Sequence, residues 1–185
     1  MLKITARLRV NRISGVILHY ENLHMKKISI VWLLLCVCII ARAADVDRKT
    51  FFVSLPDKWT ENTKDDMYSP DSFIFFEGPE STFLLVMIGQ KSAGASVDAL
   101  VNQYRDGMVK KFSDAAVSGI AKWSSFDGKG FKIDGRIQGI LKASVTIFGF
   151  EKGDNVCLVE EYATLGDYVT YASDFQKLRQ SFRLK

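Results

Sequence analysis

The sequence predicts an α+β domain, with a mostly antiparallel β-sheet of about six to seven strands. A central amphipathic helix and a C-terminal helix should pack on this sheet in an α/β/α sandwich. Apolar runs separated by turn residues predict β-hairpins both before and after residues 96–112. Within residues 96–112, and again in residues 171–184, the apolar spacing changes to three and four, which indicates helices.

The first strands are expected in the segment that follows residue 50. "TFFVSLPDKW" reads as a short strand that ends at a Leu-Pro-Asp turn, with Trp59 expected in the core. A polar loop, residues 61–71, leads to a hairpin at residues 72–89. Phe83 to Ile88 is apolar on both faces, so this strand is expected to be central and covered on both sides.

Residues 96–112 have the spacing of an amphipathic helix, and Ser96 is a suitable N-cap. A closing helix is expected within residues 171–184, capped by Ser173 or Asp174. The apolar side chains that should face the sheet are Val97, Leu100, Val101, Tyr104, Met108 and Phe112 in the first helix, and Phe175, Leu178 and Phe182 in the second.

Between these helices the period returns to two. A strand beginning near Val117 is expected to end at a tight turn at Asp127–Gly128. "GFKIDGRIQ" then alternates apolar and polar residues. A further hairpin covers residues 143–164, with its turn at residues 152–155.

Residues 25–43 have the layout of a secretory signal peptide, with a basic start, an apolar run over residues 28–40 and then small residues. Ala41 and Ala43 occupy the positions that signal peptidase reads, and Ala44 would begin the mature chain. The apolar run is shorter than the roughly 20 residues that a membrane span needs. A retained signal anchor is the alternative.

Residues 1–24 precede this signal peptide, and we interpret them as an upstream extension, with translation starting at Met25. A long n-region or an organelle transit peptide is the alternative. Residues 44–185 then form a single domain, with 18 Lys and Arg against 20 Asp and Glu, a net charge of −2. The net charge of +4 of the whole sequence therefore comes from the leader and gives no reason to expect nucleic-acid binding.

Few catalytic groups are available in residues 44–185. Both histidines lie upstream, and the single cysteine, Cys157, lies in an apolar run where a thiol behaves as a small hydrophobe. These facts exclude a Ser-His-Asp triad, a Cys-His pair and a histidine zinc site from this part of the chain. We expect no catalytic residues, metal or cofactor, and carboxylate or lysine chemistry is the remaining enzymatic alternative.

Two acidic pairs stand out, Asp65–Asp66 and Glu160–Glu161. Adjacent residues of a strand point to opposite faces, so Glu160 and Glu161 should not share one site. Asp65–Asp66 lacks the spaced acidic pattern of a calcium loop. We interpret both pairs as solvated loop charges.

The order of elements resembles the PsbP-like fold family. The resemblance lies in a strand leading into "LPDKW", a hairpin, one amphipathic helix, a meander of long strands and a terminal "DFQKLRQSFRL", and it covers nearly all of residues 51–184. It is closest in style to small exported bacterial proteins of that group, including DcrB-like ones. The resemblance implies a binding or assembly factor without catalytic residues. DcrB-like proteins are lipoproteins, but neither Cys36 nor Cys38 follows a small residue here.

We therefore expect a periplasmic or secreted, non-catalytic protein that binds another envelope or secreted protein. No nucleic-acid partner and no stable membrane span after processing are expected. The predicted partner surface is the loop with Asp65 and Asp66, together with Trp123 if that ring faces solvent, although core packing is the stronger expectation for Trp123. The alternatives are a small-ligand or lipid-binding protein, which needs a large apolar cavity, and an enzyme with two acids of perturbed pKa in one pocket.

Overall fold

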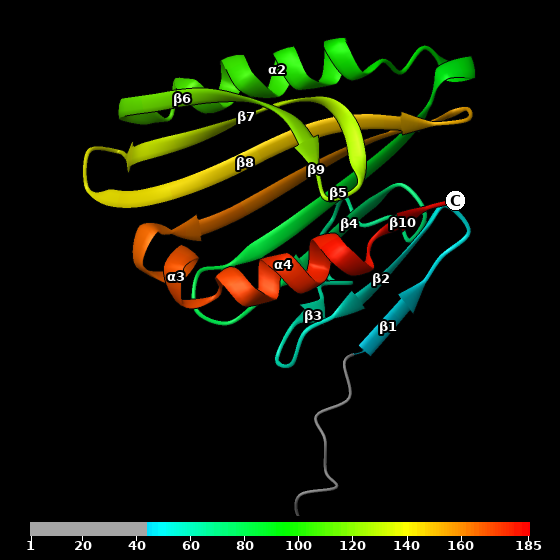
Figure 1. The fold of residues 1–185 in the computed structure, drawn as a ribbon, viewed down its shortest axis with the longest axis horizontal. Helices are drawn as coiled ribbons and strands as arrows, with labels where there is room; N and C mark the ends of the chain where they lie inside the picture. Colours follow the sequence, from blue (N-terminus) through cyan, green and yellow to red (C-terminus); the bar gives the residue numbers. More distant parts are fainter. Residues whose placement is uncertain (1–43) are drawn as a thin grey trace, which may run out of the picture. The chain divides into compact units, whose positions relative to one another are not determined.

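The computed structural model of the protein describes residues 44–185, and their centre is a large antiparallel sheet (Figure 1). Its seven strands are β3 (Thr60–Glu61), β4 (Phe73–Glu77), β5 (Phe83–Gln90), β6 (Phe112–Trp123), β7 (Phe126–Ile137), β8 (Leu141–Lys152) and β9 (Asn155–Thr164). Their order across the sheet is β3-β4-β5-β9-β8-β7-β6, and every neighbouring pair is antiparallel. The strand β9 therefore lies in the middle, between β5 and β8.

A second, three-stranded sheet joins the two ends of the described chain. Its strands are β1 (Ala44–Asp47), β2 (Phe51–Leu55) and β10 (Arg183–Leu184), in the order β1-β2-β10. The helical elements are the 3-10 turn η1 (Lys91–Ala93) and the helices α2 (Val97–Val109), α3 (Leu165–Thr170) and α4 (Ala172–Ser181). Each helix of residues 44–185 is too short or too polar to cross a bilayer.

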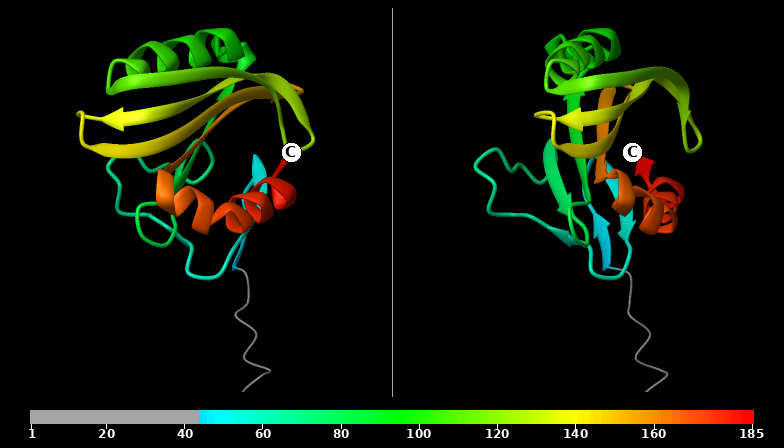
Figure 2. Two further views of the ribbon diagram at one scale, coloured as in Figure 1. Left: turned by 60° about the vertical axis from the view of Figure 1, so that its left-hand side comes forward. Right: turned by 90° about the vertical axis from the view of Figure 1, so that its left-hand side faces the viewer.

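The helices lie on opposite faces of the seven-stranded sheet (Figure 2). Helix α2 packs on β7, β8 and β9, while α3 contacts β8 and β9 from the other face and α4 packs against β2. A buried apolar cluster lies under each layer. The cluster under α2 includes Val101, Phe131, Val145, Ile147 and Leu158, and the cluster under α4 includes Phe51, Phe148, Phe150, Val159, Phe175, Leu178 and Phe182.

The predicted α+β class and its main elements are confirmed. The amphipathic helix begins after Ser96, whose hydroxyl accepts a hydrogen bond from the amide of Ala99 at 3.2 Å. Phe175, Leu178 and Phe182 are fully buried, as their spacing predicted. Trp59 is also in the core, where its ring meets Phe175 edge-on.

The prediction of a tight turn at Asp127–Gly128 is wrong. The structure turns earlier, because Trp123 pairs with Phe126 and leaves Ser124 and Ser125 as a two-residue connection. Ser124 adopts the left-handed region, with a φ of 58°. Gly128 lies inside β7, where a Cβ atom would approach the carbonyl oxygen of Gly149 to 2.2 Å.

Two further expectations need correction. Helix α4 follows Tyr171 without a side-chain cap, and Asp174 instead accepts a hydrogen bond from the Trp59 indole at 3.2 Å. The strand β5 is internal, as predicted, but it is not covered on both faces. Phe83 and Met87 are only half-buried because α2 lies over β7 to β9.

Candidate functional site

The central strand β9 carries two adjacent carboxylates inside the protein. Glu160 is 4% exposed and Glu161 is 1% exposed. Their side chains point to opposite faces, as alternation along a strand requires. Cys157, Val159 and Ala163 share the Glu161 face and belong to the α4 cluster, whereas Leu158 packs under α2 on the Glu160 face. The interpretation of this pair as solvated loop charges is therefore wrong.

Glu161 has a full set of partners. Arg179 of α4 donates to it from Nε at 2.7 Å and also from Nη2, so the ion pair is bidentate. The indole of Trp123 donates a third hydrogen bond, at 2.7 Å. Arg179 reaches the Tyr168 hydroxyl as well, at 3.3 Å. This arrangement fastens α4 and the end of β6 to the central strand, which is a structural role.

Glu160 has no such partners among residues 44–185. Its neighbours across the ladder are Leu85 on β5 and Ile147 on β8, which offer no side-chain donor. Burial raises the pKa of Glu160 from 4.5 to about 7, and the ammonium of Lys111 lowers it in part. An ionised carboxylate in such a place is costly unless a cation or hydrogen-bond donor reaches it.

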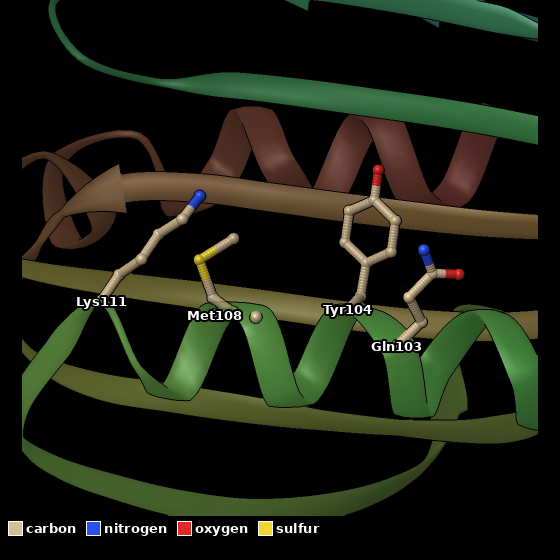
Figure 3. A pocket seen from close by; sticks show the side chains of 5 residues that line it. Gln103, Tyr104, Met108 and Lys111 are labelled. Carbon is tan, nitrogen blue, oxygen red and sulfur yellow. The ribbon is translucent and has the colours of Figure 1, made fainter.

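A groove of about 340 Å³ runs along one side of α2 (Figure 3). We call it the α2 groove, and its lining residues are Gln103, Tyr104, Gly107, Met108 and Lys111. Figure 3 shows Tyr104 and Met108 extending from the helix, and Lys111 from the segment that follows it, towards β9. Glu160 is not one of the lining residues. Burial raises the pKa of Tyr104 and the charge of Glu160 adds to this effect, while the Lys111 charge lowers the pKa of Glu160 in part.

The sheet beyond the α2 groove carries a row of partly exposed aromatic rings. Phe75 lies 4.8 Å from Phe83, and Phe83 stacks on Tyr162 at 4.8 Å between ring centroids. We call these three residues the aromatic strip. All three lie on the same face as Glu160, because Leu85 pairs with both Glu160 and Phe75 and Phe83 pairs with Tyr162. Helix α2 stops short of this part of the sheet, so the rings stay half-buried.

A second hollow, of about 210 Å³, lies on the other face of the sheet and is lined in part by Trp123, Lys132, Thr146, Tyr168 and Arg179. Its charges are already paired. Arg179 binds Glu161, and the ammonium of Lys132 lies 3.1 Å from Asp134. This hollow therefore offers an incoming ligand little uncompensated charge, in contrast to the surroundings of Glu160.

Cys157 and the buried acidic pair do not form a catalytic arrangement in residues 44–185. Cys157 is fully buried, and burial raises the pKa of its thiol, so it is not an available nucleophile. No group of three or more acidic, cysteine or histidine side chains within residues 44–185 could hold a metal ion. Because Glu160 and Glu161 lie on opposite faces of β9, they cannot act as an acid–base pair.

The predicted partner surface is not gathered in one place. Trp123 is 2% exposed and stacks on Phe150, so its ring packs in the core, which was the stronger expectation for it. Asp65 accepts a hydrogen bond from the amide of Met67 at 2.8 Å within its own loop, while Asp66 is exposed. These two aspartates remain a prediction. Ala41 and Ala43 lie outside the described residues, and Ala44 begins β1.

Sequence reasoning missed Glu160 as a site residue. The available signal was its position in "NVCLVEEYAT", where charged residues interrupt an apolar strand. The fact that decides its burial is the placement of β9 between β5 and β8, which depends on pairings across more than 70 residues.

The arrangement of strands and helices matches solved structures. The solution structure of cyanobacterial PsbP (CyanoP) from Synechocystis sp. PCC 6803 aligns with a TM-score of 0.52 over 79% of this chain and 94% of that chain, at 10% identity. The chain has a PsbP-like fold. No protein-family model matches it, and no curated protein matches it.

Two other structures align less well. LpqN, involved in cell envelope biogenesis of Mycobacterium tuberculosis, gives a TM-score of 0.48 at 12% identity, over 77% of this chain and 90% of that one. A protein from Bacteroides thetaiotaomicron VPI-5482 gives 0.46 at 11% identity, over 73% of this chain. This chain covers only 45% of that protein's length. At 10% identity, the similarity to cyanobacterial PsbP shows the fold alone.

Proposed function

We propose that this protein is an exported, non-catalytic binding protein that docks another envelope or secreted protein at the α2 groove and the aromatic strip. The observation that carries the proposal is Glu160. A buried carboxylate without a hydrogen-bond donor, next to half-exposed aromatic rings, is an unfinished interface. Groups of this kind reduce the stability of a free protein and are retained where a bound partner satisfies them.

Export is supported by the three-part layout of residues 25–43. We propose a periplasmic or secreted location, with Ala44 as the first mature residue. N-terminal sequencing of the protein isolated from its native cell tests this proposal. A mature chain that retains any of residues 1–24 would contradict the interpretation of that segment as an upstream extension.

The groove suits a protein partner better than an enclosed small molecule. Small-ligand sites bury most of the ligand surface, whereas four of the five residues lining this groove come from α2 and the fifth, Lys111, follows directly after it. An extended apolar strip beside a shallow groove is typical of a surface that receives a segment of another protein. The enzymatic alternative needs two acids in one pocket, and Glu160 and Glu161 lie on opposite faces of β9.

A photo-crosslinker placed on α2 tests the docking proposal. Met108 lies in the groove, whereas Asp106 is exposed on the opposite side of the same helix and gives a matched control position. We expect a p-benzoylphenylalanine at position 108, introduced in the native cell, to capture one exported protein that the same group at position 106 does not capture. Equal capture at both positions, or capture at neither, contradicts docking at the groove.

A further inference from the structure

We infer that one end of the seven-stranded sheet docks the protein on a membrane surface that contains anionic phospholipids. This end comprises the turn between β7 and β8 together with α3. We call its four exposed apolar residues the hydrophobic end: Ile140, Leu141, Leu165 and Val169. The inference goes beyond the proposed function, because it concerns a lipid surface and not a protein partner, and because these four residues lie outside the α2 groove and the aromatic strip.

The hydrophobic end exposes an unusual amount of apolar side chain. Ile140 is 86% exposed and Val169 is 77% exposed, while Leu141 and Leu165 are 45% and 40% exposed. Four of the six large apolar side chains that are exposed within residues 44–185 are therefore found here. Single exposed apolar residues are ordinary on a protein surface, whereas a group of them at one place marks a contact with a partner molecule or a membrane.

Strand pairing brings the four residues together from two parts of the chain. Ile140 lies in the turn that joins β7 to β8, and Leu141 is the first residue of β8. Two residues further along β8, Ala143 pairs with Thr164, the last residue of β9, and Leu165 begins α3 directly after it. The fourth member follows one helical turn later. Figure 1 shows the β7–β8 turn and α3 at the same end of the sheet.

Basic side chains surround the hydrophobic end. Lys142 on β8 pairs with Arg136 on β7, immediately beside the turn. Lys110 and Lys111 are held against the same turn, because the amide of Gln138 donates a hydrogen bond to the carbonyl oxygen of Lys111 at 3.4 Å. All four basic residues are exposed. They can therefore reach the phosphates of a lipid surface that the apolar side chains enter.

The charge of this end differs in sign from that of the domain. Residues 110–114, 136–142 and 165–170 together hold four Lys or Arg against two Asp, a net charge of +2. Residues 44–185 as a whole carry −2. The positive charge is thus concentrated where the apolar side chains are exposed, which is the arrangement that complements an anionic bilayer.

The composition favours lipid over protein at this place. Protein interfaces are enriched in aromatic side chains and arginine and depleted in lysine. The four members of the hydrophobic end are all aliphatic, and three of the four basic residues beside them are lysines. A lysine can lay its methylene groups along apolar surface while its ammonium stays at the level of the lipid headgroups. Aliphatic side chains beside lysines are typical of segments that lie in a membrane interface.

Both kinds of side chain should contribute to binding. Aliphatic side chains that enter the interface leave water, while the neighbouring cationic groups are attracted to the negative surface. Each Lys or Arg close to such a surface strengthens binding about fivefold, and salt screens this attraction. We therefore expect binding that requires anionic lipid and weakens as the salt concentration rises.

The first test measures how the purified protein sediments with vesicles. Vesicles of phosphatidylcholine alone are compared with vesicles that also contain phosphatidylglycerol, which is anionic. We expect binding to the anionic vesicles to be at least about tenfold tighter, and to be lost in high salt. A tryptophan introduced by Ile140→Trp should shift its fluorescence to shorter wavelength on the anionic vesicles. Met67→Trp, at a position that is 64% exposed in the loop before β4, is the control and should show no shift.

Variants then separate the apolar from the electrostatic contribution. The double variant Ile140→Ser with Val169→Ser should bind the anionic vesicles at least about tenfold more weakly, because two aliphatic side chains no longer enter the interface. Met67→Ser removes an exposed apolar side chain elsewhere and should leave binding unchanged. Lys142→Gln should weaken binding about fivefold, whereas Lys64→Gln, in the loop before β4, should not. The altered side chains are exposed, so thermal unfolding should show all four variants to be folded.

Three results would overturn the inference. These are equal binding to neutral and anionic vesicles, the absence of binding to either, and binding that the double variant leaves unchanged. Sedimentation with native envelope membranes but not with protein-free vesicles would mean that a protein covers the hydrophobic end, which also contradicts the lipid surface. Crosslinking from position 108 does not depend on any of these results, so the proposed function and this inference can fail separately.

Discussion

Glu160 and Glu161 are consecutive residues of one buried strand, yet Glu161 receives three hydrogen bonds from Arg179 and Trp123 whereas Glu160 receives none from the described chain. The difference follows from the two faces of the central sheet. The α4 face is closed by a helix that brings an arginine, and the α2 face is left open towards β4 and β5. The Glu161 carboxylate therefore stabilises the fold, whereas the Glu160 carboxylate is buried without a hydrogen-bond donor from residues 44–185.

The first prediction concerns Glu160 and stability. Its pKa is about 7 in the folded protein and 4.5 for an ordinary glutamate, so the folded state binds the proton more tightly. Folding stability should then decrease as the pH rises from about 4.5 to 7, by about 3 kcal/mol in total. Glu160→Gln should remove this dependence and make the protein more stable at pH 8. Urea unfolding at pH 5 and pH 8 measures both effects.

The matched control for this experiment is Glu151→Gln, because Glu151 is exposed. It should leave the difference between pH 5 and pH 8 as it is in the unaltered protein. A Glu160→Gln variant that is less stable than the unaltered protein at pH 8 would show that the carboxylate has an internal partner.

The second prediction concerns the ion pair on the other face. Arg179→Met leaves Glu161 buried without its main partner, so we expect a loss of about 3 kcal/mol in the free energy of unfolding. The double variant Arg179→Met with Glu161→Gln should lose less than the sum of the two single variants, because neither charge is then left alone. Denaturant unfolding of all four proteins gives the coupling energy. Additive losses would mean that the two side chains act independently.

Much of this architecture could be predicted because it is encoded locally. Ser96 and the spacing of the apolar residues after it specify α2, and the placement of Phe175 and Leu178 three residues apart specifies the buried face of α4. The hairpin of β4 and β5 also follows from a local pattern, two apolar runs around a Gly-Pro turn. In each case the informative residues lie within one or two turns of one another.

The features that the sequence did not reveal depend on distant residues. The strand β10 has only two residues and pairs with β2 across some 130 positions of the sequence. A strand this short has no alternation of apolar and polar residues from which it could be predicted. The burial of Glu160 depends on which strands flank β9. The aromatic strip is left partly exposed because α2 packs on β7, β8 and β9 and does not cover β4 and β5. The candidate site is thus a product of strand order, which residue patterns alone do not determine.

The third prediction concerns the closing helix. Leu178 is fully buried between α4 and the sheets, so Leu178→Ala should cost about 2–5 kcal/mol, a large part of the stability of a domain this size. Gln176→Ala, two residues away on the exposed side of the same helix, is the matched control and should cost little. Thermal unfolding compares the two. An unchanged melting temperature in Leu178→Ala would show that the helix does not pack as described.

The fourth prediction concerns Gly128, whose role is packing rather than turning. A Cβ atom at this position would lie 2.2 Å from the carbonyl oxygen of Gly149 and 2.9 Å from the ring of Phe148, so β7 and β8 would have to move apart. Gly128→Ala should therefore destabilise the protein by about 1–3 kcal/mol. Gly119, on the adjacent strand β6, has nothing within 4 Å of its Cβ position, and Gly119→Ala should be tolerated. Urea unfolding distinguishes the two, and equal stability of both variants would contradict the close approach of β7 to β8.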